Sequence, residues 1–185
     1  MKNTFAEHTN ELIQAAQAAE PFHKQVEEVV VHLREAFTAG NKVLIAGNGG
    51  SAAEAQHFSD EMLGRYRGER RPYPAVALTA DTAAITCIGN DYGFDQIFAR
   101  QIEALGNEGD VFIGLTTSGT SKNILAAADM ARAKGMTVIA LTGRKGVFTK
   151  MADAAIESPS DKAAIVQEFH LHAIHLICEA FEETK

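Results

Sequence analysis

The chain has 185 residues, of which 46% are hydrophobic and 22% are charged, and its formal net charge is −7. This length and composition are typical of one soluble globular domain, and the acidic balance argues against a nucleic-acid-binding protein, which needs basic side chains to neutralise phosphates. The N-terminus lacks the apolar run of a secretory signal, and no apolar segment is long enough to cross a bilayer, so we expect a cytoplasmic protein without a membrane partner.

Two helices are expected at the start of the chain. Residues 5–20 and residues 21–41 both place apolar side chains at helical spacing. Pro21 stands at the expected start of the second helix, and Gly40 stands near its end, where these two residue types are common. We therefore expect a pair of N-terminal helices within residues 1–40, before the main core.

From residue 43 onward, short strands are predicted to alternate with helices. The strands are uninterrupted apolar runs, typical of strands buried on both faces, and they comprise residues 43–46, 75–78, 111–115 and 138–141. A fifth, weaker strand is expected at residues 154–156. Helical spacing of apolar residues marks the segments 51–66, 95–106, 121–135 and 161–183. This alternation predicts an α/β fold, a three-layer sandwich in which helices cover both faces of a central parallel sheet of about five strands.

Two loops rich in glycine and hydroxyl groups follow two of these strands. The first has the sequence AGNGGS at residues 46–51, and the second has the sequence TTSGTS at residues 116–121. In an open parallel sheet, ligands bind at the carboxyl ends of the strands, where glycines let the backbone approach and the first N–H groups of the next helix point at the ligand. The hydroxyl groups add donors without adding charge, so two such loops predict a phosphate-binding site.

The first loop has two alternative interpretations. The spacing of Gly47 and Gly49 matches the GxGxxA pattern of dinucleotide-binding proteins, but that pattern expects an acidic residue about 20 positions further on, and the first carboxylate after the second strand is Asp81. In the other interpretation, Ser51 serves only as a helix N-cap, as does Ser121 in the second loop. The hydroxyl-rich second loop favours a small phosphorylated metabolite, because each oxygen of a monophosphate accepts several hydrogen bonds.

Candidate acid, base and metal-binding groups lie on two predicted helices. His57 and Glu61 stand four residues apart, on one face of the helix that follows the first loop. On the last helix, the stretch QEFHLHAIH places Gln167 and His175 about 12 Å apart along the helix axis, so they bracket one ion only if both side chains reach inward. A solvated helix face is the alternative for both patterns, since charged and polar residues are common on exposed helices.

The two cysteines, Cys87 and Cys178, form no CxxC pair and provide no disulfide framework. Each of them has an isoleucine as one of its neighbours. We expect each to be a small buried side chain rather than a reactive thiol.

Four stretches of the sequence resemble, in order and spacing, the sugar isomerase (SIS) domain of the bacterial sedoheptulose-7-phosphate isomerases, also called phosphoheptose isomerases. They are AGNGGSAAEAQHFSDEMLGRY, ITCIGNDYGFDQIFARQI, GDVFIGLTTSGTSKN and QEFHLHAIHLICE. The resemblance covers nearly the whole chain. It implies a single SIS domain over residues 1–185 with a flavodoxin-like topology, in which residues 1–40 form the N-terminal helices and residues 41–185 form the α/β core and the long C-terminal helix.

The resemblance implies an aldose–ketose isomerase that converts sedoheptulose 7-phosphate to D-glycero-D-manno-heptose 7-phosphate through an enediol, for the heptose of lipopolysaccharide or capsule. It also implies one Zn²⁺ per subunit and a homotetramer with sites at the subunit interfaces. Two alternatives stay open. One is a non-catalytic SIS-domain protein that binds a phosphosugar or associates with the replication initiator DnaA, although such paralogues lack the carboxylate and the histidine at the positions of Glu61 and His175. The other is an isomerase of another sugar phosphate.

The resemblance further assigns residues to the site. Those that would contact the substrate are Asn48, Gly49, Gly50, Ser51, Glu61, Asn90, Asp91, Thr116, Thr117, Ser118, Ser121 and Gln167. Those that would bind zinc are His57, Glu61, Gln167 and His175. Glu61 and His175 also match the catalytic base and its acid partner. The family's usual STSGNS turn differs here at Thr116 and Thr120, and its usual TARIQE is replaced by AAIVQE at residues 163–168, which leaves the substrate range open.

Overall fold

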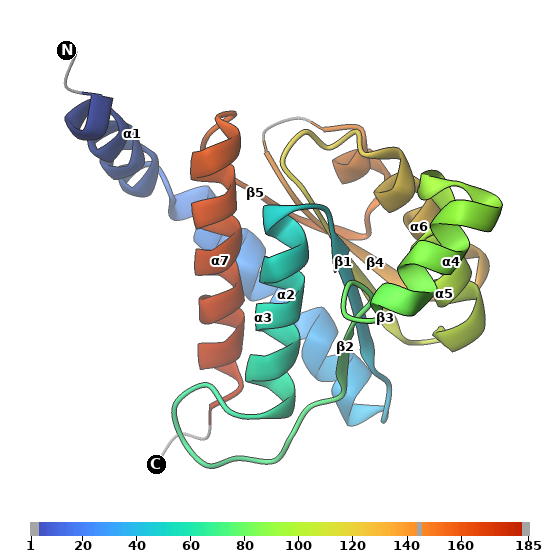
Figure 1. Ribbon diagram of the computed structural model, residues 1–185. Coiled ribbons are helices and arrows are strands. Elements are labelled where there is room, and N and C mark those ends of the chain that lie inside the picture. The colour runs from blue at the N-terminus through green and yellow to red at the C-terminus, as the bar shows by residue number, and fades with distance from the viewer. Residues whose placement is uncertain (1–3, 144–145, 183–185) are drawn as a thin grey trace.

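The computed structural model describes residues 4–143 and 146–182, and in this part of the chain a parallel sheet lies between two layers of helices (Figure 1). The predicted α/β sandwich is therefore confirmed. Within the same residues, no helix has both the length and the apolar character that a bilayer crossing demands.

Two helices open the chain, as predicted. Helix α1 spans Thr4–Gln17 and helix α2 spans Glu20–Thr38. Pro21 lies in the first turn of α2, where the backbone N–H that proline lacks would have no partner within the helix. Gly40 follows α2 with a φ of 83°, a left-handed conformation that suits glycine.

Five parallel strands form the sheet in the order β2-β1-β3-β4-β5. Their bounds are Val43–Gly47 for β1, Ala75–Ala77 for β2, Val111–Thr116 for β3, Thr137–Thr142 for β4 and Ala154–Glu157 for β5. Every residue of β1 and β3 is buried, as their continuous apolar runs predict. The prediction of two buried faces is wrong for β2, where Val76 is 41% exposed, because this strand lies at the edge of the sheet and is covered on one face only.

The helices cover the two faces of the sheet in separate groups. Helix α3 (Gly50–Leu63), helix α7 (Ala163–Ala180) and α2 lie on one face, and helix α5 (Ala99–Leu105) and helix α6 (Lys122–Ala133) lie on the other (Figure 1). Two short 3-10 helices are η1 (Phe94–Gln96) and η2 (Phe148–Met151). The helix predicted over residues 95–106 is divided between η1 and α5, with Ile97 and Phe98 buried between them.

The sequence predictions missed one helix, α4, which spans Thr82–Tyr92. Asp81 caps its N-terminus by accepting a hydrogen bond from the backbone N–H of Ala84 at 2.9 Å. No residue of α4 is fully buried, and Ile85 and Ile88 are only partly buried against the core, so the helix leaves a weak apolar pattern in the sequence. Cys87 lies on α4 and is exposed, contrary to the expectation, whereas Cys178 on α7 is buried as expected.

Helices α3 and α7 lie side by side and run in the same direction, away from the carboxyl edge of the sheet (Figure 1). Towards their C-terminal ends, the sulfur atoms of Met62 and Cys178 are 4.0 Å apart. Burial raises the pKa of the Cys178 thiol to about 12, so this group is an uncharged part of the core. Side chains at matching heights on α3 and α7 therefore meet, although they are more than one hundred residues apart in the sequence.

Candidate active site

The first glycine loop turns the chain sharply from β1 into α3. A Cβ atom at Gly47 would lie 2.4 Å from the carbonyl oxygen of Ser51, and Gly49 has a φ of 58°, so both positions need glycine. Ser51 lies inside the first turn of α3 and is only 3% exposed, while the N-cap position belongs to Gly49. The interpretation of Ser51 as an N-cap is therefore wrong.

Hydroxyl groups of the second loop, residues 116–121, bond to one another at the carboxyl end of β3. The hydroxyl oxygens of Thr116 and Ser121 are 2.9 Å apart. Ser118 Oγ accepts hydrogen bonds from the backbone N–H of Thr120 at 3.2 Å and from its hydroxyl at 3.1 Å. Ser121 occupies the N-cap position of α6 but makes no capping bond with its side chain, so capping does not explain this serine.

The turn of the second loop packs closely against the segment that follows β4. A Cβ atom at Gly119 would lie 2.4 Å from the Cα of Gly146 and 3.0 Å from the hydroxyl of Thr142, and one at Gly143 would lie 2.6 Å from the carbonyl oxygen of Thr117. Backbone meets backbone here, so larger side chains cannot enter. The turn is thus a rigid frame for its hydroxyl groups.

Two carboxamides hold the two loops together. Asn48 Nδ2 donates to Asn123 Oδ1 at 2.9 Å, and Asn123 Nδ2 donates to Asn48 Oδ1 at 2.8 Å. Asn123 lies in the first turn of α6 and is 2% exposed, so this pair replaces hydrogen bonds to water. Because β1 and β3 are neighbours in the sheet, the pair joins the loops that follow them. Sequence reasoning missed Asn123. The pattern that could have indicated it is an amide side chain just after a hydroxyl-rich turn.

His57, Glu61 and His175 converge between α3 and α7. One nitrogen or oxygen atom from each of them lies within 4.8 Å of the others. The Nε2 atoms of His57 and His175 are 3.1 Å apart, and Nε2 of His57 is 3.5 Å from Oε1 of Glu61. The Glu61 side chain is only 18% exposed and that of His57 is 39% exposed, so a solvated helix face does not describe Glu61.

This donor set has the composition and spacing of a metal site. Two imidazoles and one carboxylate are common ligands of catalytic zinc, whose bonds of about 2.0–2.2 Å separate tetrahedral ligands by roughly 3.3–3.6 Å. The two shortest separations in the cluster, 3.1 Å and 3.5 Å, lie close to that range. His57, Glu61 and His175 therefore form a group able to hold a metal ion.

Gln167 lies near the start of α7, next to the first loop. A Cβ atom at Gly50 would lie 2.5 Å from Nε2 of Gln167, so the glycine leaves space for the carboxamide. Eight residues of helix separate Gln167 from His175, an axial distance of about 12 Å. The side chain of Gln167 thus connects the first loop to the helix that carries His175.

Asn90 and Asp91 lie near the end of α4, and both are exposed. Asn90 Nδ2 donates to Asp91 Oδ1 at 2.7 Å, and the Cys87 thiol lies 3.7 Å from Asp91 Oδ2. Ile85 and Ile88 of the same helix pack against the core on the face of the sheet opposite to α3 and α7. Within the described residues, these contacts join the Asn90–Asp91 pair to its own helix and not to the cluster of His57, Glu61 and His175.

Tyr66 is a further residue at the cluster that sequence reasoning missed. Its ring lies against the imidazole of His175, with ring centroids 5.7 Å apart and planes tilted by 30°. Arg67 also stacks on the Tyr66 ring, with its guanidinium carbon 5.0 Å from the ring centroid. An aromatic residue in an irregular segment offers no periodic signal, so only the fold shows this contact.

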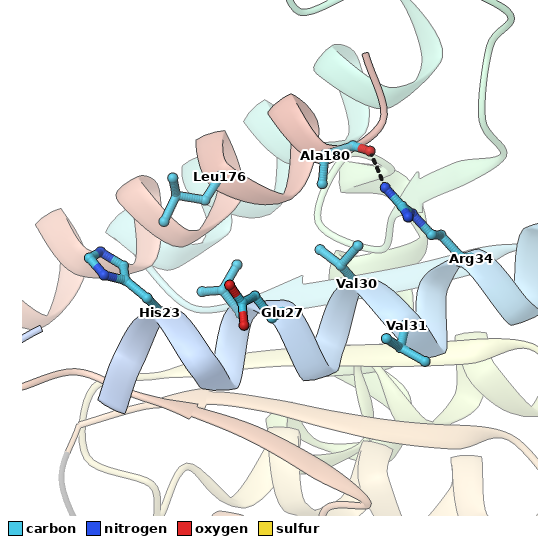
Figure 2. A pocket seen from close by; sticks show the side chains of 8 residues that line it. His23, Glu27, Val30, Val31, Arg34, Leu176 and Ala180 are labelled. Atoms are coloured by element: carbon cyan, nitrogen blue, oxygen red, sulfur yellow. Dashed lines mark hydrogen bonds between the residues drawn. The ribbon is translucent and has the colours of Figure 1, made fainter. Parts of the chain in front are cut away.

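An open groove of about 620 Å³ lies between α2 and α7, and Figure 2 shows the side chains that line it. Val30, Val31 and Leu176 give it an apolar surface, and Val31 is 54% exposed. At one end, Arg34 donates a hydrogen bond to the carbonyl oxygen of Ala180 at 2.7 Å. None of the predicted site residues lines this groove, so it is a separate surface feature.

Comparison with known proteins agrees with the geometry. The family model described as "SIS domain" matches residues 4–143. A phosphoheptose isomerase of Campylobacter jejuni is 47% identical over 169 residues, which cover 91% of each chain. Two solved phosphoheptose isomerases each match over 96% of both chains: that of Francisella tularensis has 40% identity and a TM-score of 0.92, and that of Neisseria gonorrhoeae has 42% identity and a TM-score of 0.90.

Proposed function

The chain belongs to the SIS-domain family, among the phosphoheptose isomerases, and on that premise we propose that it isomerises sedoheptulose 7-phosphate to D-glycero-D-manno-heptose 7-phosphate. It is a sugar-phosphate isomerase, and its product would enter heptose synthesis for lipopolysaccharide or capsule. The observation that carries this proposal is the convergence of His57, Glu61 and His175 between α3 and α7, together with two loops suited to a phosphorylated ligand at the edge of the sheet from which both helices run.

The reaction needs two groups that move protons. A base removes the proton from the carbon beside the carbonyl, which gives an enediol, and the same proton is returned to the neighbouring carbon, while a second group moves a proton between the two oxygens. We assign Glu61 as the base and His175 as the group that serves the oxygens. The pair suits these roles because both side chains reach one point from different helices, with His57 between them.

The two loops would hold the rest of the substrate. The hydroxyls of Thr116, Thr117, Ser118 and Ser121 would donate to the phosphate, which needs no net positive charge on the protein. The first loop, with Asn48, Gly49, Gly50 and Ser51, would contact the sugar together with Gln167. The amide pair of Asn48 and Asn123 supports this arrangement, because it holds the two loops at one edge of the sheet.

We further propose zinc as the metal, held by His57, Glu61, Gln167 and His175. Bound there, zinc would supply a Lewis acid that polarises the carbonyl oxygen of the sugar. A carboxylate that binds a metal is a weaker base, so the two roles of Glu61 compete. Turnover measured as zinc is removed by a chelator and then restored shows whether the metal is needed. Loss of activity on removal supports a catalytic metal, and unchanged activity in metal-free protein contradicts it.

We propose a homotetramer with sites at the subunit interfaces. The apolar groove between α2 and α7 and the uncovered helix α4 are surfaces of the kind that protein partners bury. Contact between copies would also bring Asn90 and Asp91 of one subunit to the cluster of another. Light scattering tests the assembly, and a monomer at assay concentrations would contradict it.

We also propose a single SIS domain over residues 1–185 and a cytoplasmic location, where both free cysteines would remain reduced.

The central experiment is turnover of sedoheptulose 7-phosphate by wild-type protein and by Glu61→Gln. The amide keeps the size of the carboxylate but takes no proton, so we expect kcat to fall by about 10²–10⁴-fold. Calorimetry with the substrate should show that binding is retained. Asp60→Asn is the matched control, because Asp60 is an exposed carboxylate in the same helical turn. A near-normal rate for Glu61→Gln would refute the assignment.

The same assay distinguishes the two alternative functions. A non-catalytic SIS-domain protein predicts no turnover at any zinc concentration, and capture of an initiator protein such as DnaA would then favour it. The presence of Glu61 and His175 in one cluster speaks against that alternative. Because Ala163 and Ile165 replace the Thr and the Arg usual in the family, other ketose phosphates belong in the assay, and faster turnover of one of them would change the assigned substrate.

A further inference from the structure

Helix α3 carries Glu61 in its last turn and ends at Leu63. The last carbonyl groups of this helix therefore have no partner within it. Arg70 supplies two of the missing donors. Its Nη2 donates to the carbonyl oxygen of Glu61 at 2.6 Å, and its Nη1 donates to that of Met62 at 3.1 Å. The backbone N–H of Tyr73 also donates to Met62, at 2.9 Å. A guanidinium at this end also complements the negative end of the helix dipole.

Arg70 is itself almost completely enclosed. Its side chain is 1% exposed, and its guanidinium carbon lies 5.2 Å from the centroid of the Tyr73 ring. Its Nε lies 3.4 Å from Oε1 of Glu182, a residue that comes just after the end of α7. The Glu182 side chain is 16% exposed. A buried charge with a partner and satisfied donors is held in one geometry, and removal of either partner leaves the other unpaired.

Glu182 fastens the segment between α3 and β2, residues 64–74, to the end of α7. It accepts hydrogen bonds from the backbone N–H of Gly68 at 2.7 Å and of Arg67 at 3.4 Å. These bonds, Gly68 first, and the charge of Arg70 hold the pKa of Glu182 below its usual value, which keeps it ionised at neutral pH. We call residues 64–74 the strap.

The strap touches both halves of the cluster. Arg70 holds the backbone of Glu61, and Tyr66 lies against the ring of His175. A second ion pair, 2.9 Å from Arg67 Nη1 to Glu179 Oε2, ties the strap to α7 one turn after His175. The last turn of α3 and the C-terminal half of α7 are therefore connected by one short segment.

We propose that Arg70 is a positioning residue for the isomerase reaction: it fixes the last turn of α3 so that the Glu61 carboxylate faces His57 and His175. The proposal rests on the function assigned above. Helix ends fray unless their carbonyl groups are bonded, and a catalytic group displaced by about 1 Å loses on the order of 10²-fold in rate. Glu182 acts one step further away, by holding Arg70.

The test compares Arg70→Lys with Arg71→Lys. Lysine keeps the positive charge but lacks the planar fork that reaches two carbonyl groups. Arg71 is a fair control, because its guanidinium also stacks on Tyr73, at 4.9 Å, while the described residues show no hydrogen bond from its side chain to α3. We expect Arg70→Lys to lower kcat by about 10–100-fold with KM changed by less than about threefold, and to weaken zinc binding by about tenfold in a chelator competition.

A purely structural role predicts another result. Arg70→Lys would then lower the unfolding temperature but leave kcat, KM and zinc affinity of the folded protein equal to those of Arg71→Lys, which would overturn the proposal. If Arg70→Lys does not fold, Glu182→Gln takes its place, with an expected loss in kcat of about 3–10-fold at constant KM. If wild-type protein turns over no ketose phosphate, the assigned function fails, and zinc affinity alone then decides whether Arg70 positions the cluster.

Discussion

Replacing Gly50 by alanine tests whether Gln167 must keep its place next to the first loop. The added Cβ would lie 2.5 Å from Nε2 of Gln167, and ordinary contacts begin at 3.4 Å, so the carboxamide must move by about 0.9 Å (3.4 − 2.5). The moving atom is the end of a flexible side chain, and Gly50 has no left-handed φ. Alanine also favours helix over glycine by up to about 1 kcal/mol.

We therefore expect Gly50→Ala to separate activity from stability. The free energy of unfolding, measured with urea, should stay constant or rise by up to about 1 kcal/mol, while kcat/KM falls on the order of 10–100-fold because Gln167 is displaced. Gly89→Ala is the control for stability: it adds a Cβ to another helix at an ordinary 3.6 Å from Ile97. A Gly50→Ala protein with wild-type turnover and zinc affinity would refute the role of Gln167.

Asn123→Leu leaves the carboxamide of Asn48 without its partner, so we expect urea denaturation to show a loss of about 1–3 kcal/mol in unfolding free energy, and an unchanged midpoint would contradict this. The pKa of His172 is lowered from 6.5, first by burial and then by the charges of His23 and His175. Because the unfolded chain then binds the proton more tightly, this residue's contribution to stability is complete above pH 6.5 and declines as the pH falls towards the lower folded-state pKa. His172→Gln should make the stability of metal-free protein less dependent on pH as the pH falls from neutral through 6.5, and parallel curves for the two proteins would show the reasoning wrong.

The strands were predictable because burial on both faces leaves a direct mark on the sequence. Runs such as VLIA and VFIGL contain no polar residue. Both sets of alternating side chains are therefore apolar, as a strand buried on both faces requires. Helix α4 left a weaker mark, since its apolar residues Ile85 and Ile88 are only partly buried. Val76 was misjudged for a related reason: an apolar residue at the edge of a sheet has the same sequence signature as one at its centre.

The candidate site was predictable only in part. The loops and the His57–Glu61 spacing are local patterns, and both could be recognised before the fold was known. The contact between His57 and His175 depends on two helices that run in the same direction from one edge of the sheet, and no local pattern contains it. The resemblance to the sugar isomerase domain provided that pairing. Tyr66 and Arg70 belong to an irregular segment, where neither periodicity nor a recognised motif marks a residue.

The position of the cluster follows from contacts at both ends of α3. At its start, Gly50 lies against Gln167 of α7, and at its end, Arg70 binds the carbonyl group of Glu61 and reaches Glu182 beyond α7. A helix fixed at one end can still tilt or rotate at the other, which would change the separation of His57 and His175 first. Fixing both ends removes that freedom. Gly50 and Arg70 therefore both fix the position of α3, although they lie 20 residues apart in the sequence and act through different contacts.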